Sequence, residues 1–266
     1  MDDVKINWDS VKGQIGSYGE NKPFDHVVID DFFDADFAEK LSNEFPHFDS
    51  EVWHGYNNPI EVKRVCNNWN VFPSATYALF SYFNSSDWLS FLGEQLLRGV
   101  KLYGDSGLNG GGWHVHKRGG KLNTHLDYSL HPKLGLQRKL NIIIYMNKNW
   151  HESWGGSLGL WGNESAEKPG ELIKSVWCKF NRAVIFDTTQ NSWHGLPDPL
   201  DCPENECRKS LAAYFLCEAP QDVDKRGKAL FAPTKEQEGD IEILDLIRQR
   251  SDVNTASAVY TKGAEK

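Results

Sequence analysis

The stretch Lys121 to Tyr128 reads KLNTHLDY and is the most informative segment of the chain. Alternate residues of a β-strand point to the same face, so His125 and Asp127 would direct an imidazole and a carboxylate to one point. A third candidate ligand, His194, lies further along in NSWHG. Two imidazoles and a carboxylate are a common set of metal ligands. The sequence therefore predicts a metal site formed by these three residues.

An H-x-D pair alone also occurs by chance at a solvated strand edge, so further residues are needed. Arg208 begins the apolar strand RKSLAAYFL, in which Arg208 and Ser210 share a face. A guanidinium in such a strand needs an anion, because burying an unpaired charge is costly and Arg is suited to bidentate carboxylate pairing. A metal site with an arginine nearby suggests a dicarboxylate cosubstrate. The ligand set itself is the facial triad of non-haem Fe(II) oxygenases.

A central strand supplies the next candidates. In RKLNIIIYMN, residues 138–147, the side chains of Asn141, Ile143 and Tyr145 fall on one face, and both faces are largely apolar. A strand covered on both sides buries the Tyr145 hydroxyl, which then needs a hydrogen-bond partner. A carboxylate held by Arg208 would be such a partner.

Taken in order, several segments resemble the 2-oxoglutarate and Fe(II)-dependent oxygenases, and within them the prolyl 4-hydroxylase-like branch. The resemblance covers about residues 23 to 218 and is strongest in the catalytic part. The matching segments are PFDHVVIDDFF (23–33), HLD (125–127), IIIYMNKNW (142–150), WGGSLGLW (154–161), FNRAVIFD (180–187), WHG (193–195) and RKSLAAYF (208–215).

The resemblance implies a role for each candidate residue. His125, Asp127 and His194 would bind Fe(II), and Arg208 would complete the catalytic set by pairing with the distal carboxylate of 2-oxoglutarate. Tyr145 would donate to the same carboxylate. Ser210 and Asn141 are further candidates on the cosubstrate side.

The implied reaction uses 2-oxoglutarate and O2, with ascorbate as a further cofactor, and releases succinate and CO2 as a C–H bond is hydroxylated. The implied substrate is a peptide of prolyl type, an amino acid or a glycan. Two departures from the family pattern are visible. Collagen-type members carry Lys where this chain has Arg208, and the Tyr that often precedes the H-x-D by about ten positions is replaced by Val115.

Two other functions remain open from the sequence. One is a non-catalytic jelly-roll protein that has kept its metal. The other is a zinc-dependent cupin-type hydrolase or isomerase, for which His114 and His116 could join His125 in an all-His site. We prefer the iron triad and expect His114 and His116 to line the mouth of the substrate pocket. The other predicted lining residues are Asp105, Trp113, Lys117, Arg118, Tyr128, His131, Trp154 and Trp193.

Composition narrows the partners. The net charge of −8 argues against sequence-independent nucleic-acid binding and would suit a neutral or basic target. No apolar run approaches the roughly 18 residues that span a bilayer, so no membrane association is expected. The five cysteines have no repeated spacing, and the first residues, MDDVKINWDS, lack the features of a signal peptide. We therefore expect reduced thiols and a cytoplasmic protein.

The predicted fold class is mainly β with flanking α-helices, and the resemblance implies a double-stranded β-helix, the jelly roll of cupin-like proteins. Residues 1–100 are predicted to supply a strand at 26–33 and helices that pack on the barrel, with caps at Asp34, Ser74 and Ser86. Residues 101–220 would form the catalytic core, since short apolar runs alternate there with Gly- and Pro-rich turns. Residues 221–266 would add a helix at 239–250 and a frayed tail, all within one domain.

Overall fold

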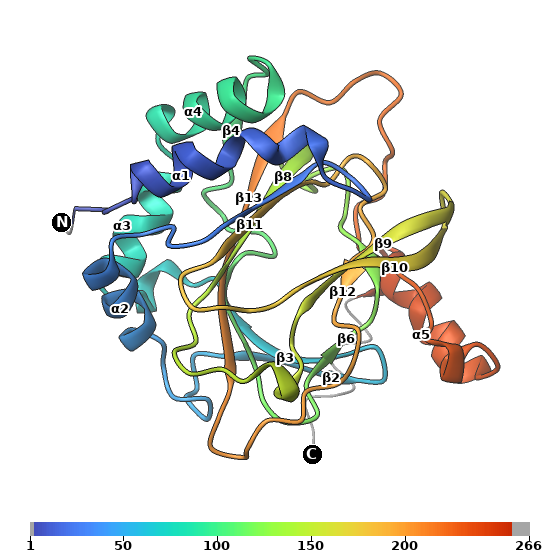
Figure 1. The fold of residues 1–266 in the computed structure, drawn as a ribbon. Helices are drawn as coiled ribbons and strands as arrows, with labels where there is room; N and C mark the ends of the chain where they lie inside the picture. Colours follow the sequence, from blue (N-terminus) through green and yellow to red (C-terminus); the bar gives the residue numbers. More distant parts are fainter. Residues whose placement is uncertain (1–2, 257–266) are drawn as a thin grey trace.

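Two antiparallel sheets form the body of the protein, which a computed structural model describes over residues 3–256 (Figure 1). In order across the larger sheet the strands are β1 (His26–Ile29), β11 (Ala183–Asp187), β8 (Gln137–Tyr145), β13 (Arg208–Cys217), β5 (Gly112–His116), β3 (Glu61–Cys66) and β2 (His54–Asn58), while β4 (Tyr103–Gly104) pairs with β13 and β6 (Lys121–Leu122) pairs with β3. The smaller sheet runs β10 (Lys168–Val176), β9 (Leu158–Ser165), β12 (His194–Gly195), β7 (His125–Leu126) and β14 (Leu230–Phe231). This is the double-stranded β-helix predicted above, so the fold class is confirmed.

The two sheets enclose one apolar core between them. Val184 and Phe186 of β11 belong to the same buried cluster as Leu158 and Leu160 of β9. Burying such side chains is the main favourable contribution to folding, at roughly 25 cal/mol per Å² of apolar surface. The residues that line the pocket come from strands of both sheets.

Alternation along β8 divides its side chains between two environments, as the sequence predicts. Leu140, Ile142 and Ile144 belong to the core shared with the helices, while Tyr145 belongs to the core between the sheets. Strand β13 pairs with β8 in a register that sets Ser210 opposite Tyr145. The same register therefore brings the predicted cosubstrate residues of both strands together.

Four helices cover the outer face of the larger sheet, and the fifth lies beside the smaller sheet (Figure 1). The helices are α1 (Trp8–Gln14), α2 (Ala35–Asn43), α3 (Ser74–Phe83), α4 (Ser86–Leu97) and α5 (Ile241–Ser251), with short 3-10 segments at Ile15–Glu20, Trp69–Val71, Glu152–Trp154 and Lys235–Gln237. Aromatic rings fill the layer under the helices, and the stacked pair Phe83 and Trp88 lies at its centre. Phe32, Phe33, Phe80, Phe83 and Trp88 are thus core residues.

The helix caps differ in detail from those predicted. Asp34 stands at the N-cap of α2 without a side-chain cap bond, and Ser74 is the first residue of α3, not its cap. The free amides of α3 are instead held by Glu44, whose carboxylate accepts from the backbone N–H of Thr76 at 2.7 Å. Helix α4 is capped by Ser85, one residue before the predicted Ser86.

The remaining predictions about the chain have different outcomes. The predicted C-terminal helix is present as α5, capped by Asp240. The predicted frayed tail lies largely outside the described residues, and the three-part division of a single domain stays a prediction. All five cysteines are free thiols. Within residues 3–256 every helix is too short or too polar to cross a bilayer.

Candidate active site

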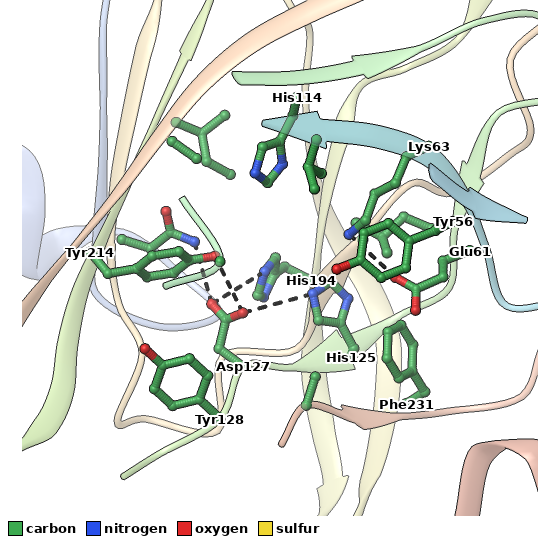
Figure 2. A pocket seen from close by; sticks show the side chains of 18 of the residues that line it. Tyr56, Glu61, Lys63, His114, His125, Asp127, Tyr128, His194, Tyr214 and Phe231 are labelled. Carbon is green, nitrogen blue, oxygen red and sulfur yellow. Dashed lines mark hydrogen bonds and ion pairs between the residues drawn. The ribbon is translucent and has the colours of Figure 1, made fainter. Parts of the chain in front are cut away.

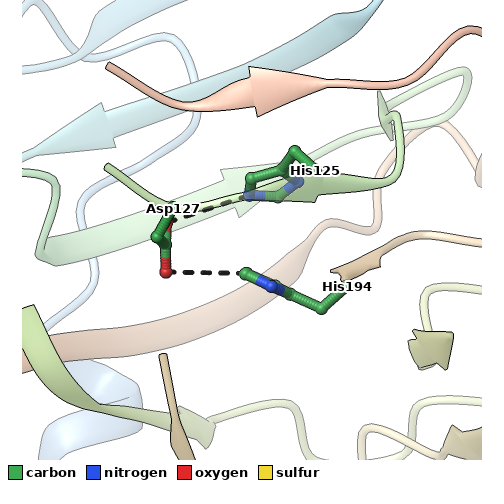
Figure 3. A group of neighbouring side chains, drawn as sticks. All are labelled: His125, Asp127 and His194. Carbon is green, nitrogen blue, oxygen red and sulfur yellow. Dashed lines mark ion pairs between the residues drawn. The ribbon is translucent and has the colours of Figure 1, made fainter. Parts of the chain in front are cut away.

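Three buried side chains converge at the smaller sheet. His125 of β7 and His194 of β12 are direct partners in the antiparallel register, and Asp127 follows immediately after β7 (Figure 3). Asp127 Oδ1 lies 4.0 Å from His125 Nε2, and Asp127 Oδ2 lies 3.8 Å from His194 Nε2. One ligand atom of each residue lies within 4.8 Å of the others, and no further group of this kind occurs among the described residues. The predicted triad is therefore assembled.

Backbone hydrogen bonds fix the orientation of both imidazole rings. His125 Nδ1 lies 2.9 Å from the carbonyl oxygen of Asn123, and His194 Nδ1 lies 2.8 Å from that of Ser192. A carbonyl oxygen accepts a hydrogen bond only from a protonated Nδ1, so each ring presents the lone pair of its Nε2 to the common point. Burial lowers the pKa of both histidines, which keeps the rings neutral. Two neutral imidazoles and a carboxylate match the donor set of a facial Fe(II) site.

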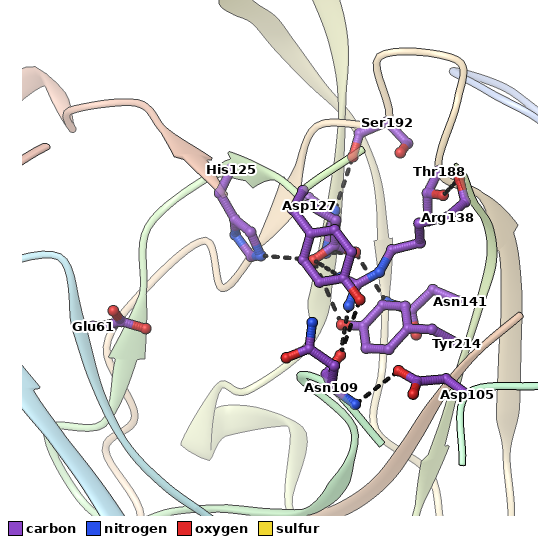
Figure 4. Close-up of polar contacts among 12 residues, drawn as sticks. Glu61, Asp105, Asn109, His125, Asp127, Arg138, Asn141, Thr188, Ser192 and Tyr214 are labelled. Carbon is purple, nitrogen blue, oxygen red and sulfur yellow. Dashed lines mark hydrogen bonds and ion pairs between the residues drawn. The ribbon is translucent and has the colours of Figure 1, made fainter. Parts of the chain in front are cut away.

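Asp127 is held by a buried arginine. Arg138 Nη1 lies 3.2 Å from Asp127 Oδ1, and Arg138 Nη2 donates to the carbonyl of Asn109 at 2.7 Å (Figure 4). Its guanidinium is sandwiched between two rings, 3.4 Å from the centroid of Tyr128 and 3.3 Å from that of Tyr214. Burial alone would raise the pKa of Asp127, but Arg138 and the two histidines bring it to about 2. The carboxylate is therefore ionised and ready to bind a cation.

Asn141 also acts on this carboxylate. Its Nδ2 donates to Asp127 Oδ2 at 3.3 Å. The sequence placed Asn141 on the cosubstrate side because it shares a face with Tyr145, and it does line the pocket. The contact that the structure records is with the Asp127 carboxylate of the predicted metal triad.

Arg208 and Tyr145 form a second polar group, in which the Arg208 guanidinium lies 5.0 Å from the centroid of the Tyr145 ring. Arg208 is 4 % exposed, and its Nε donates to the carbonyl of Gly156 at 2.7 Å. No ion pair of Arg208 occurs within residues 3–256, and the buried carboxylate of Asp187 on β11 pairs with Lys139 at 2.6 Å. The Tyr145 hydroxyl is fully buried without a hydrogen-bond partner, and burial raises its pKa to about 12. An unpaired guanidinium beside an unpaired hydroxyl fits the carboxylate of 2-oxoglutarate.

Gly156 makes room for Arg208. Its φ of +84° is a conformation that L side chains rarely adopt, and an added Cβ would lie 2.9 Å from Arg208 Cδ. The Gly-Gly pair therefore allows the backbone to approach the guanidinium closely.

A pocket is lined by the three triad residues and by Arg208, while Tyr145 lies outside its lining (Figure 2). His114 and His116 line it from β5, where they stand opposite Ser210 and Arg208 in the register. Both ring nitrogens of His116 and Nε2 of His114 are buried without hydrogen-bond partners. Neither residue joins His125 in a metal-binding group among the described residues, so the all-His zinc site is not formed.

Of the other predicted lining residues, Tyr128 lines the pocket and the rest do not. Trp113 and Trp193 are fully buried in apolar clusters. Asp105 and His131 are both buried, and His131 Nε2 lies 3.6 Å from Asp105 Oδ2. The other three, Lys117, Arg118 and Trp154, also lie outside the pocket lining.

Several lining residues were not predicted. Arg138 could have been found by the reasoning applied to Arg208, because it too begins a buried apolar strand. Glu61 and Lys63 of β3 line the opposite side of the pocket, and Lys228 and Arg250 come from the C-terminal region. No local sequence signal connects the last two with His125, Asp127 and His194.

Comparison with known proteins agrees with this geometry. Residues 111–216 match the family model of the 2OG-Fe(II) oxygenase superfamily. The chain is 26 % identical over 222 residues to prolyl 3-hydroxylase OGFOD1 of Xenopus laevis; the match covers 80 % of this chain and 39 % of that protein. The chain thus spans about two fifths of the length of this curated relative.

Two solved structures share the fold. A prolyl 4-hydroxylase of Pseudomonas putida superposes with a TM-score of 0.54 at 16 % identity, covering 77 % of this chain and 99 % of that one. A prolyl hydroxylase of Trichoplax adhaerens, solved with a peptide fragment of hypoxia inducible factor, has the same TM-score and identity over 79 % of this chain and 88 % of its own. At this identity the likeness supports the double-stranded β-helix alone.

Proposed function

We propose that the protein is a 2-oxoglutarate- and Fe(II)-dependent oxygenase that hydroxylates a prolyl-type C–H bond of a peptide, and the match of residues 111–216 to the family model supports this proposal. The observation that carries the cosubstrate assignment is Arg208, a buried guanidinium without an ion pair within the described residues, next to the unpaired Tyr145 hydroxyl. A non-catalytic metal protein or a zinc enzyme would have no use for such a charge. An oxygenase needs it, since 2-oxoglutarate is a dianion.

Each group has an assigned part in this proposal. His125, Asp127 and His194 would hold Fe(II), and Arg208 and Tyr145 would hold the distal carboxylate of 2-oxoglutarate, with Ser210 beside them on β13. When bound, the metal and cosubstrate supply an oxidant that places one oxygen atom of O2 in a C–H bond and the other in succinate, with release of CO2. With only three protein ligands, the metal would keep open positions.

The protein's own contribution is positioning. Arg138 and Asn141 hold Asp127 from two directions, and the backbone carbonyls of Asn123 and Ser192 hold the two rings. Such fixed geometry reduces the reorganisation required at the moment of reaction. The aromatic ring of Phe231 stacks on His125 with centroids 5.0 Å apart, which shields one side of the metal site from water.

The prolyl substrate is supported by the relatives. The curated relative is a prolyl 3-hydroxylase, and the match extends over most of this chain. The pocket is lined by side chains from both sheets and from the C-terminal region, so it can contact residues on either side of a target proline.

A peptide screen tests the proposal. The protein is purified without oxygen, loaded with Fe(II), 2-oxoglutarate and ascorbate, and exposed to air with a library of proline-containing peptides. We expect a peptide that gains the mass of one oxygen atom on proline, with one succinate formed for each hydroxylation. If free amino acids or glycans stimulate succinate formation and no peptide does, the prolyl assignment is wrong.

A further inference from the structure

The pocket has the opposite charge to the chain as a whole. The sequence carries a net charge of −8, yet the pocket lining contains five cationic side chains and two carboxylates. The cationic residues are Lys63, Arg138, Arg208, Lys228 and Arg250, and the carboxylates are Glu61 and Asp127. Fe(II) and the 2-oxoglutarate dianion cancel each other formally, so the loaded pocket would keep the same excess of positive charge.

Part of this excess is used by the site already described. Arg138 pairs with Asp127, and Arg208 is assigned to the cosubstrate. The other lining carboxylate, Glu61, is fully buried. Glu61 Oε2 lies 3.4 Å from Lys63 Nζ, and Glu61 Oε1 lies 3.1 Å from Arg250 Nε.

Lys228 is the cationic lining residue that has no carboxylate partner in these ion pairs. It lines the same pocket as Arg250 and forms no ion pair within the part of the chain that the structure describes. Burial lowers the pKa of Lys228, and Arg250 lowers it further. Two neighbouring cations in a partly desolvated pocket create a favourable place for an anion.

Lys63, Lys228 and Arg250, which we call the cationic cluster, lie in the same pocket as His125, Asp127 and His194. Figure 2 shows Lys63, Tyr56 and Glu61 on one side of His125, and Asp127 on the other. The charge of Lys63 contributes to the lowered pKa of both His125 and His194. Arg250 lies over the ring of Phe231, at 5.5 Å, and that ring stacks on His125. An anion bound here would therefore be held close to the carbon that is oxidised.

We propose that the substrate carries an anionic group, a carboxylate or a phosphate, near the oxidised C–H bond, and that Lys63 and Lys228 bind it beside Arg250. This inference rests on the proposed oxygenase function and adds a substrate class to it. All three cations lie outside residues 111–216, the part matched by the family. They come from β3, from the segment before β14 and from α5, so this chain's own flanking segments would determine its specificity.

Direct binding of four matched peptides tests the inference. Fluorescent proline peptides are prepared with Glu, phosphoserine, Gln or Lys next to the proline, and their Kd values are measured by anisotropy on protein loaded with Fe(II) and 2-oxoglutarate without oxygen. We expect at least one of the two acidic peptides to bind about 10-fold tighter than the Gln peptide, and the Lys peptide to bind weakest, with the preference reduced by salt. The stronger acidic peptide identifies the anion as carboxylate or phosphate.

Three variants assign the effect to the cluster. Lys228→Gln should remove most of the preference for the acidic peptide, and Arg250→Lys, which keeps the charge, should retain most of it. Arg248→Gln is the matched control, because Arg248 lies on the same helix with its side chain 79 % exposed. A thermal melt of each variant confirms that it is folded. Equal binding of the Gln and acidic peptides, no binding of any peptide, or an unchanged preference in Lys228→Gln would each overturn the inference.

The outcome is separable from that of the proposed function. Admitting oxygen to the same samples shows whether the bound acidic peptide is hydroxylated on proline. Selective binding without oxygen transfer would refute the prolyl assignment and leave the anion site in place. If the Gln peptide is hydroxylated as efficiently as the acidic peptides, the anion site is refuted and the prolyl assignment is retained.

Discussion

Replacing Arg138 with Met should destabilise the metal-free protein strongly, because it leaves Asp127 buried without its cation. Arg138 is 2 % exposed and Asp127 is 8 % exposed, so neither group can turn to water for compensation. Breaking one side of a buried ion pair costs about 3–5 kcal/mol. The methionine side chain keeps much of the packing between Tyr128 and Tyr214, so the loss reports mainly on the charge.

This magnitude is easily measured by thermal melting of the metal-free protein. For a chain of this size, about 1 kcal/mol corresponds to roughly 2–4 °C, so the expected decrease in Tm is on the order of 10 °C. Fe(II) added without oxygen should narrow the difference, because the ion supplies positive charge beside Asp127.

The matched control is Arg118→Met. Arg118 pairs with Asp201 at the surface, where both side chains are about half exposed or more, and such a pair contributes under about 1 kcal/mol. If the two variants melt within a degree or two of each other, Asp127 does not depend on Arg138 and our description of the triad's support is wrong.

Three further predictions concern the rest of the pocket. Arg208→Gln should raise the KM for 2-oxoglutarate at least about 30-fold, since losing a buried charge partner costs roughly 2–5 kcal/mol; an unchanged KM in a succinate assay would remove Arg208 from the cosubstrate site. Gly156→Ala should also raise that KM, because the new Cβ would meet Arg208 Cδ at 2.9 Å, whereas Gly16→Ala, with open space around it, should behave as wild type. His116→Gln should flatten the pH dependence of stability. Burial lowers the pKa of His116, so below about pH 6.5 the unfolded chain binds the extra proton and the free energy of unfolding falls by up to about 1.4 kcal/mol per pH unit. Denaturation of the metal-free protein at pH 7.5 and pH 5 measures this slope, and identical slopes in both proteins would contradict the assignment.

The parts of the site that alternation controls could be predicted from sequence. The two faces of 138–147 and of 208–216 are those expected, because strand geometry fixes them locally. The same rule would have excluded Trp113 and Trp193 from the predicted pocket lining. Trp113 and Trp193 are the immediate neighbours of His114 and His194, so they must point to the opposite face, into the core.

The parts that depend on long-range contacts could not be predicted. Glu44 caps a helix that begins thirty residues later, and nothing in the sequence near Ser74 indicates this partner. Arg250 reaches Glu61 only because α5 folds back beside β14. Loops and flanking segments of this kind determine the specificity of a shared scaffold, which explains why the metal triad was predictable and the charge of the pocket was not.

Equilibrium dialysis without oxygen measures the amount of Fe(II) bound per chain and so tests whether His125, Asp127 and His194 bind the metal. We predict one Fe(II) per wild-type chain, with affinity reduced at least about 100-fold in Asp127→Ala because one of three ligands and its charge are lost. Full occupancy in Asp127→Ala at the same free Fe(II) concentration would show that the metal binds elsewhere, and the oxygenase site described above would have to be abandoned.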